Sequence, residues 1–161
     1  MASDPTGRRP SVRLSSDEAW SVLDEAHTGI LTTLRRDGTP VTLPTWFVTI
    51  DRQIYLRTPT QTKKVARIRR NPVVAFVVES GERWAELKAV HLTGRAELLD
   101  EDSPLIAQVE AALEQKYSAY RTSPSDMPER TRDHYVKYGS AYVRIVADDR
   151  ILSWDNSRLG I

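Results

Sequence analysis

A short cationic stretch near the middle of the chain has the residue types of a phosphate-binding turn. Arg57 and Thr58 end an apolar segment, and Lys63 and Lys64 follow in what is predicted to be the first turn of a helix. A helix N-terminus exposes unpaired N–H groups and the positive end of the helix dipole. Lysines are unfavourable there unless an anion neutralises them, so the spacing predicts a phosphate site.

The alternative is a solvated basic helix whose lysines point away from the protein. The whole chain has 23 basic and 22 acidic residues, a net charge of +1. This near-neutral balance disfavours a nucleic-acid partner. Residues 57–70 nevertheless contain no acidic side chain, and their basic residues are Arg57, Lys63, Lys64, Arg67, Arg69 and Arg70. The last three of these are expected at the surface or at a subunit contact.

Other kinds of active site are not indicated by the sequence. The chain has no cysteine, which excludes disulfides, thiolate nucleophiles and cysteine-bound zinc. Its histidines, His27, His91 and His134, lack metal-ligand spacing, so no metal site is predicted. A glycine-rich dinucleotide fingerprint, a Walker loop and a Gly-x-Ser-x-Gly elbow are all missing, which disfavours a nucleotide kinase or a hydrolase.

The length of 161 residues fits one domain. We expect a polar, disordered tail over residues 1–13 and a single cofactor-binding domain over 14–161. No apolar run approaches the roughly 20 residues that span a bilayer, and the N-terminus lacks the apolar core of a signal peptide. A cytoplasmic protein without a membrane partner is therefore expected.

Helices are indicated by capping residues and by apolar residues at helical spacing. Ser15 and Glu18 form a capping box before a pattern that ends at Gly29. Ser103 and Pro104 are the expected N-cap and first residue of a longer helix. In total, these patterns predict helices between Ser15 and Gly29 and over residues 60–70, 103–121 and 129–138.

Strands are indicated by short segments of β-branched residues between turn residues. Segment 73–79 is nearly all apolar and is expected to be buried on both faces, whereas Gly94 predicts a bulge or a tight bend. Parallel β-α-β alternation is absent, so the predicted fold class is mainly β with inserted helices, arranged as a small antiparallel barrel. The predicted strands are 30–34, 41–50, 54–58, 73–79 and 89–99, followed by a hairpin of 141–146 and 150–154.

The order of these segments resembles the pyridoxamine-5'-phosphate-oxidase-like split-barrel superfamily over roughly residues 14–155. The resemblance rests on Gly29–Pro40, Thr42–Phe47, Tyr55–Thr58, Lys63-Lys64 and Arg69–Val74, taken in this order. Within the superfamily, the chain looks most like the small actinobacterial branch whose members use the deazaflavin coenzyme F-420.

This resemblance implies a six-stranded antiparallel split β-barrel that forms a homodimer, with the cofactor in a groove between the subunits. In Ser153-Trp154-Asp155, Trp154 would approach the cofactor ring from the other subunit. The implied activity is hydride transfer from reduced deazaflavin to a small unsaturated acceptor of the enone or quinone type. The implied cofactor contacts are Thr42, Leu43, Pro44, Thr45 and Trp46 for the ring and Arg57, Thr58, Lys63 and Lys64 for the phosphate.

Two alternatives stay open on the same fold. The first is an FMN-binding oxidoreductase, because one phosphate pocket serves either cofactor. The second is a non-catalytic cofactor-binding protein. Trp46 has a second interpretation as a barrel-core residue, and Trp154 as a core or interface aromatic.

Hydride reduction also requires a proton, and the sequence does not assign its donor. Tyr55, His91 and Tyr135 are the candidates, and no catalytic residue is named. The stretches expected to select the substrate are residues 81–84 and 123–130.

Overall fold

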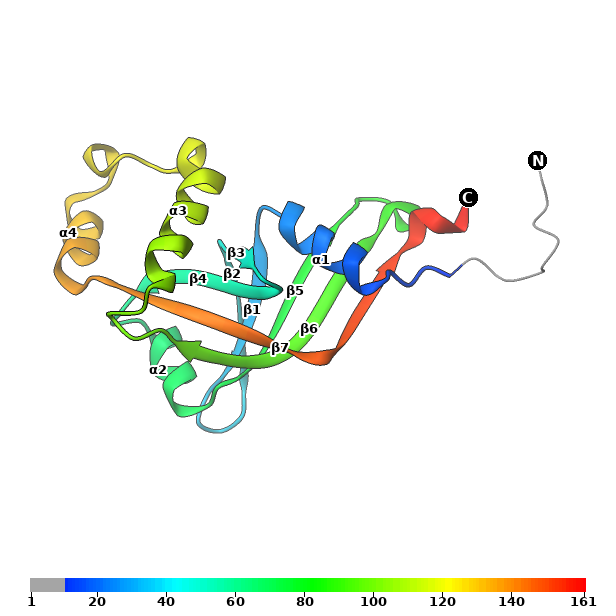
Figure 1. The fold of residues 1–161 in the computed structure, drawn as a ribbon. Helices are drawn as coiled ribbons and strands as arrows, with labels where there is room; N and C mark the ends of the chain where they lie inside the picture. Colours follow the sequence, from blue (N-terminus) through cyan, green and yellow to red (C-terminus); the bar gives the residue numbers. More distant parts are fainter. Residues whose placement is uncertain (1–10) are drawn as a thin grey trace.

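A single antiparallel sheet of seven strands, curled around an apolar interior, forms the body of the protein (Figure 1). The computed structural model describes residues 11–161, except for the side chains of His134 and Tyr135. The strand order across the sheet is β2-β1-β5-β6-β7-β4-β3. The strands are β1 (Gly29–Leu34), β2 (Pro40–Thr45), β3 (Val48–Ile50), β4 (Gln53–Pro59), β5 (Val73–Ser80), β6 (Lys88–Leu98) and β7 (Ser140–Asp155).

The predicted fold class, an antiparallel split barrel with inserted helices, is confirmed, with seven strands where six were expected. The segment predicted as one strand over 41–50 forms both β2 and β3, which occupy opposite edges of the sheet. Only Trp46 and Phe47 separate them. Because an extended chain advances at most ~3.6 Å per residue, the two edges must lie close together at this point. The sheet therefore curls back on itself.

The last part of the sheet is one long strand, β7, where a hairpin of 141–146 and 150–154 was predicted. The first part of β7 pairs with β4, and β7 also runs beside β6 from Lys88 to Leu98. The register between β6 and β7 shifts next to Gly94, so the bulge predicted there is confirmed. Between the pairs Gly94–Ala147 and Leu92–Ile151, β6 has only Thr93, whereas β7 has Asp148, Asp149 and Arg150, which form a bulge within one strand and not a turn.

The two faces of the sheet have different surroundings. Val74, Phe76 and Val78 of β5 are buried inside the barrel, whereas Val73 on the other face is 45% exposed. Successive side chains of a strand point to opposite faces, and no helix within residues 11–161 packs extensively against β5. The prediction that segment 73–79 is buried on both faces is therefore wrong for this chain alone.

Helices α1 (Ser16–Glu25) and α2 (Lys63–Arg70) close the interior of the barrel (Figure 1). Trp20 and Leu23 of α1 and Ile68 of α2 join the same buried cluster as the inner side chains of the strands. The capping box of Ser15 and Glu18 is present. Helix α2 begins later than the predicted residue 60 because Thr62 serves as its N-cap, accepting a hydrogen bond from Val65 N–H at 3.3 Å.

Helix α3 (Leu105–Tyr117) covers the outer face of β3 and β4. It ends before the predicted residue 121, and the chain continues through the short 3-10 helices η2 (Ser118–Tyr120) and η3 (Pro124–Asp126) into α4 (Glu129–Tyr138). Helices α3 and α4 stand on the same side of β4 and β7 (Figure 1). Within residues 11–161, no helix has both the length and the apolar character needed to cross a membrane.

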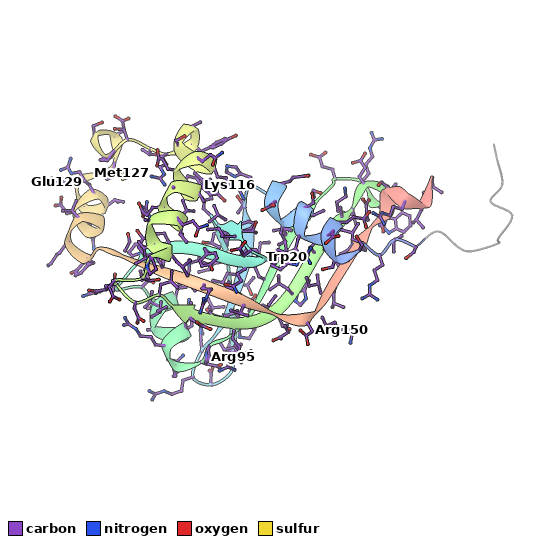
Figure 2. The ribbon with its side chains drawn as sticks, in the orientation of Figure 1. Trp20, Arg95, Lys116, Met127, Glu129 and Arg150 are labelled. Atoms are coloured by element: carbon purple, nitrogen blue, oxygen red, sulfur yellow. The ribbon has the colours of Figure 1, made fainter. Side chains whose placement is uncertain are left out.

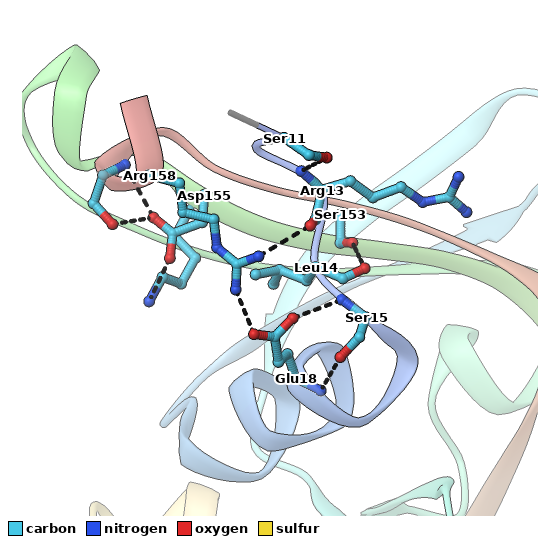
Figure 3. Close-up of polar contacts among 10 residues, drawn as sticks. Ser11, Arg13, Leu14, Ser15, Glu18, Ser153, Asp155 and Arg158 are labelled. Atoms are coloured by element: carbon cyan, nitrogen blue, oxygen red, sulfur yellow. Dashed lines mark hydrogen bonds and ion pairs between the residues drawn. The ribbon is translucent and has the colours of Figure 1, made fainter. Parts of the chain in front are cut away.

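The two ends of the described chain are joined by polar contacts (Figure 3). Of the tail predicted over residues 1–13, residues 1–10 lie outside the described residues, and the rest runs beside the end of β7. Asp155 N–H donates to the carbonyl of Val12 at 2.7 Å, and Arg158 donates to the carbonyl of Arg13 at 3.1 Å. Arg158 also donates to the Glu18 carboxylate. The pKa of Glu18 is lowered by the Ser15 backbone N–H and by Arg158.

A substitution at Gly94 tests how closely the backbones of β6 and β7 approach each other. A Cβ atom added there would lie 2.3 Å from the carbonyl oxygen of Val146, a backbone atom of the paired strand. We expect Gly94→Ala to lower the free energy of unfolding by about 1–3 kcal/mol, because the strands must separate to admit the methyl group. Urea denaturation measures this change.

The matched control is Arg95→Ala, which truncates an exposed side chain at the next position of β6. It is expected to change the free energy of unfolding by less than about 0.5 kcal/mol. Equal stability of the two variants would contradict the close approach.

Candidate functional site

The predicted phosphate ligands of β4 lie on opposite faces of the sheet. Thr58 is buried, 6% exposed, whereas Arg57 points toward α3, where its Nη1 donates to Glu110 Oε1 at 2.9 Å. The hydroxyl of Tyr142 donates to the same carboxylate. Burial opposes the charge of Arg57, but the hydrogen bond and charge of Glu110 raise its pKa. Arg57 therefore already has an anionic partner within the chain.

Lys63 and Lys64 occupy the first turn of α2, as predicted. That turn contains no acidic residue, and no ion pair found within residues 11–161 includes either lysine. Burial lowers the pKa of Lys64, and the neighbouring charge of Arg67 lowers it further. The positive charge at this helix N-terminus is thus not compensated by a carboxylate of the described residues.

Two arginines extend this positive charge along α2 toward the end of β1. Arg67 Nε donates to Thr33 Oγ1 at 2.7 Å, and Arg70 Nη2 donates to the carbonyl of Leu34 at 3.2 Å. The pKa of Arg67 is lowered by burial and by the charges of Arg35 and Arg70. These groups repel one another, so an anion placed among them would be stabilised. We call Arg35, Lys64, Arg67 and Arg70 the basic cluster.

The predicted ring-binding strip, Thr42 to Trp46, is β2 and the residue that follows it. β2 is an edge strand, and its Leu43 is 47% exposed. Thr42 Oγ1 lies 2.9 Å from Thr32 Oγ1 on the neighbouring strand, and Thr45 Oγ1 donates to the carbonyl of Trp46 at 3.2 Å. The strip therefore presents exposed side chains and the unpaired edge of the sheet, and its Thr42 end lies next to Val41, opposite the end of β1 that α2 contacts.

Tyr117 of α3, which was not among the predicted site residues, fixes the end of this strip. Its ring stacks on Trp46, with centroids 4.5 Å apart and planes 7° from parallel. Its hydroxyl accepts from Phe47 N–H at 2.9 Å and lies 2.7 Å from the carbonyl of Phe47 and 2.8 Å from that of His27. One hydroxyl proton is shared between these two carbonyls. Burial raises the pKa of Tyr117.

A pocket of about 820 Å³ opens between the end of β4, helix α3 and helix α4. Three predicted site residues, Trp46, Arg57 and Thr58, line it, whereas Lys63 and Lys64 do not. Its other side chains come from α3, the α3–α4 connection, α4 and the start of β7, and they include Leu113, Glu114, Tyr117, Tyr120, Arg121, Met127, Arg132 and Val136. The sequence had no signal for this pocket beyond the stretch 123–130.

Trp154 and the loop 81–84 lie away from this pocket within one chain. Trp154 pairs with Ala89 near the far end of β7, whereas β4 pairs with β7 only over Ser140–Ile145. At ~3.3 Å per residue, these two parts of the strand are separated by roughly 30 Å. The loop 81–84 joins the same far end, since Asn156 Nδ2 donates to the carbonyl of Trp84 at 2.7 Å.

Of the candidate proton donors, Tyr55 and His91 do not line the pocket. Tyr55 is 3% exposed and donates to Gln53 Oε1 at 2.9 Å. His91 lies on the outer face of β6, opposite Leu152 of β7. The side chain of Tyr135 is outside the described residues. Within the described part of the chain, no three histidine or acidic residues are grouped to bind a metal ion.

Known proteins resemble this chain in sequence and in fold. Residues 15–147 match the family model described as pyridoxamine 5'-phosphate oxidase. A conserved hypothetical protein from Mycobacterium tuberculosis is 30% identical over 97% of this chain and 94% of its own, with a TM-score of 0.77. No protein of curated function matches the chain.

Two further solved structures share the fold at lower identity. A FAD-binding protein from Mesorhizobium loti is 22% identical over 87% of this chain and 94% of its own, with a TM-score of 0.66. An F-420 reductase is 23% identical over 81% of this chain and 93% of its own, with a TM-score of 0.58.

The hydroxyl of Tyr117 is expected to stabilise the fold at the join between β2 and β3. Tyr117→Phe leaves the buried Phe47 N–H without its acceptor, which is expected to lower the free energy of unfolding by about 1–3 kcal/mol. Urea denaturation measures the loss, and the ring stack on Trp46 is preserved in this variant.

Tyr120→Phe removes the same group from a tyrosine that is 62% exposed, and serves as the control. This variant is expected to stay within about 0.5 kcal/mol of the natural protein. A Tyr117→Phe protein with unchanged stability would show that the hydroxyl does not hold the join.

Proposed function

Because the chain belongs to the pyridoxamine 5'-phosphate oxidase family, we propose that it is an oxidoreductase that uses coenzyme F-420. In this proposal a reduced deazaflavin delivers a hydride to a small unsaturated acceptor of the enone or quinone type. The wider family contains binders of several flavin-type cofactors, as the F-420 reductase and the FAD-binding protein among the similar structures illustrate.

One observation carries the proposal: the basic cluster lies where β1 pairs with Pro40 and Val41, next to the Thr42 end of the exposed strip, and forms no ion pair with a carboxylate of the described residues. Lys64 and Arg67 have lowered pKa values because they are partly buried next to other cations. A phosphate there gains charge-assisted hydrogen bonds and removes the repulsion. The residues present thus fit an anionic cofactor.

The extent of the basic cluster favours coenzyme F-420 over a flavin mononucleotide. A single phosphate needs two or three cations, which the first turn of α2 supplies. Arg67 and Arg70 lie one to two turns further along the helix, where both contact β1. Coenzyme F-420 carries a tail of glutamate residues in addition to its phosphate, and such a tail matches a longer row of cations.

The residues of this chain bind and orient the cofactor, which supplies the hydride chemistry when bound. Trp46 is held in one position by Tyr117, so the end of the ring-binding strip is rigid. Arg57 shares its guanidinium between Glu110 and any phosphate that approaches. Lys63 and Lys64 therefore contribute more to phosphate binding than Arg57. The proton that completes the reduction comes from water in this proposal.

We also propose that the protein is a homodimer with the cofactor groove between its subunits. A row of side chains crosses the outer face of five paired strands in register, and none of them is buried within the described chain. The row is mostly apolar and consists of Pro44, Ile30, Val77, His91 and Leu152. A second subunit on this face would bury it and would bring its own Trp154 toward the strip of the first.

Fluorescence titration with coenzyme F-420, FMN and FAD tests the cofactor assignment. We expect saturable micromolar binding of coenzyme F-420 and weaker binding of the two flavins. Lys63→Ala and Lys64→Ala should each weaken binding by about 1–3 kcal/mol, because each removes a charge-assisted contact. As the pH rises through the lowered pKa of Lys64, below its ordinary value of about 10.4, affinity should fall.

Arg69→Ala is the matched control, since it removes the same charge from an exposed position on another side of α2. It should leave the affinity for coenzyme F-420 within about twofold, as for a screened surface charge. Tight FMN or FAD binding without binding of coenzyme F-420 would replace the deazaflavin proposal. Unchanged affinity in both lysine variants would remove the phosphate site from α2.

Analytical ultracentrifugation tests the homodimer. Leu152→Glu places a charge at a side chain that is 46% exposed on the outer sheet face, and we expect it to shift the dimer to a monomer. Val136→Glu, at an apolar side chain on α4 that is 80% exposed, should leave the dimer intact. A natural protein that is monomeric while it binds cofactor would contradict the groove between subunits.

A further inference from the structure

Most of the residues that line the pocket between β4, α3 and α4 are not among the proposed cofactor contacts. Trp46, Arg57 and Thr58 form one side of it, and the other sides come from α3, the connection that follows and α4. Figure 2 labels Met127 in this connection. A volume of about 820 Å³ is in the range of small-molecule sites. A second molecule beside the cofactor therefore has room to bind.

Large apolar side chains are left exposed around this pocket. Trp46 is 38% exposed, Tyr120 is 62% exposed and Val136 is 80% exposed, and all three line it. The ring of Trp46 is fixed by its stack on Tyr117, and the ring of Tyr120 lies edge-on to His27 with centroids 4.5 Å apart. Two flat aromatic surfaces held in place favour a planar, largely apolar ligand.

The arginines of the pocket differ in how completely they are neutralised. Arg57 donates to Glu110 at 2.9 Å, and Arg121 lies 2.7 Å from Glu114. The ion pair of Arg132 with its chain neighbour Asp133 is at 3.8 Å, longer than a hydrogen bond. Among the described residues, no hydrogen bond of the Arg132 guanidinium is found, so its donors are available to a ligand, and its planar fork suits an anionic oxygen.

We propose that this pocket binds the acceptor of the redox reaction, and that the acceptor is a planar ring compound carrying one anionic oxygen. Trp46 and Tyr120 contact its rings, and Arg132 binds its oxygen. The assignment rests on the proposed function, because it places the acceptor next to the strip proposed for the cofactor ring, with Trp46 as the shared residue. Arg132 and Tyr120 then determine which acceptors bind.

Two quinones that differ by one anionic oxygen test this inference. Lawsone is a hydroxynaphthoquinone that is ionised at neutral pH, and naphthoquinone has the same rings without the charge. Calorimetric titration is carried out on the natural protein without cofactor and again with saturating coenzyme F-420. We expect lawsone to bind about tenfold more tightly than naphthoquinone, as a partly exposed charge-assisted contact allows.

Three variants separate the contributions of Arg132 and Tyr120 to quinone binding. Arg132→Gln should remove the preference for lawsone without changing the affinity for naphthoquinone. Tyr120→Ala should weaken the binding of both quinones by about threefold to tenfold, the worth of one aromatic contact. Arg130→Gln removes the same charge two positions earlier, from an exposed side chain outside the pocket lining, and should change neither affinity.

The outcomes distinguish the pocket from the cofactor site. Equal affinity for the two quinones, or a preference that survives Arg132→Gln, overturns the anionic acceptor. A parallel loss of coenzyme F-420 affinity in Tyr120→Ala assigns the pocket to the cofactor and overturns the acceptor site. If the protein binds none of the flavin-type cofactors, the proposed function fails, while the quinone titrations of the cofactor-free protein still decide the ligand class of the pocket.

Discussion

The hydroxyl of Tyr117 holds the point at which the two edges of the sheet meet. It accepts from Phe47 N–H and donates toward the carbonyl of Phe47, where the chain passes from β2 to β3, and toward that of His27, just before β1. The backbone groups of Phe47 cannot pair in a strand, because the chain is changing there from one edge of the sheet to the other. An unpaired buried backbone group is costly, so a single side chain of α3 makes the split in the barrel possible.

The same tyrosine joins the fold to the site. Its ring fixes Trp46 at the end of the exposed strip, and it belongs to the buried cluster in which α3 packs against Tyr55 of β4. The pocket lies in the space that remains between these elements. The strip proposed for the cofactor and the pocket proposed for the acceptor therefore share one rigid aromatic pair.

Charge is distributed unevenly in a chain that is close to neutral overall. Arginines near α3, such as Arg57 and Arg121, have carboxylate partners on that helix. No member of the basic cluster of α2 and the end of β1 forms an ion pair with a carboxylate of the described residues, and burial together with neighbouring cations lowers the pKa values of Lys64 and Arg67. Positive charge that the fold leaves uncompensated in one place is typical of a site for an anionic ligand.

The sequence by itself determined the local elements and the fold class. The capping box at Ser15, the bulge at Gly94 and the lysines in the first turn of α2 were all predicted, because each depends on neighbouring residues or on backbone sterics. The family resemblance supplied the split barrel, since the order of the segments is itself a sequence property.

Only the tertiary structure decided how these elements meet. Segment 41–50 had the pattern of one strand, and its division between two sheet edges depends on Tyr117, which is distant in the chain. Neighbouring residues Arg57 and Thr58 were predicted to act together, yet the alternation of a strand places them on opposite faces, and Glu110 of α3 pairs with one of them. Such long-range pairings determine the shape and charge of a site, and no local pattern encodes them.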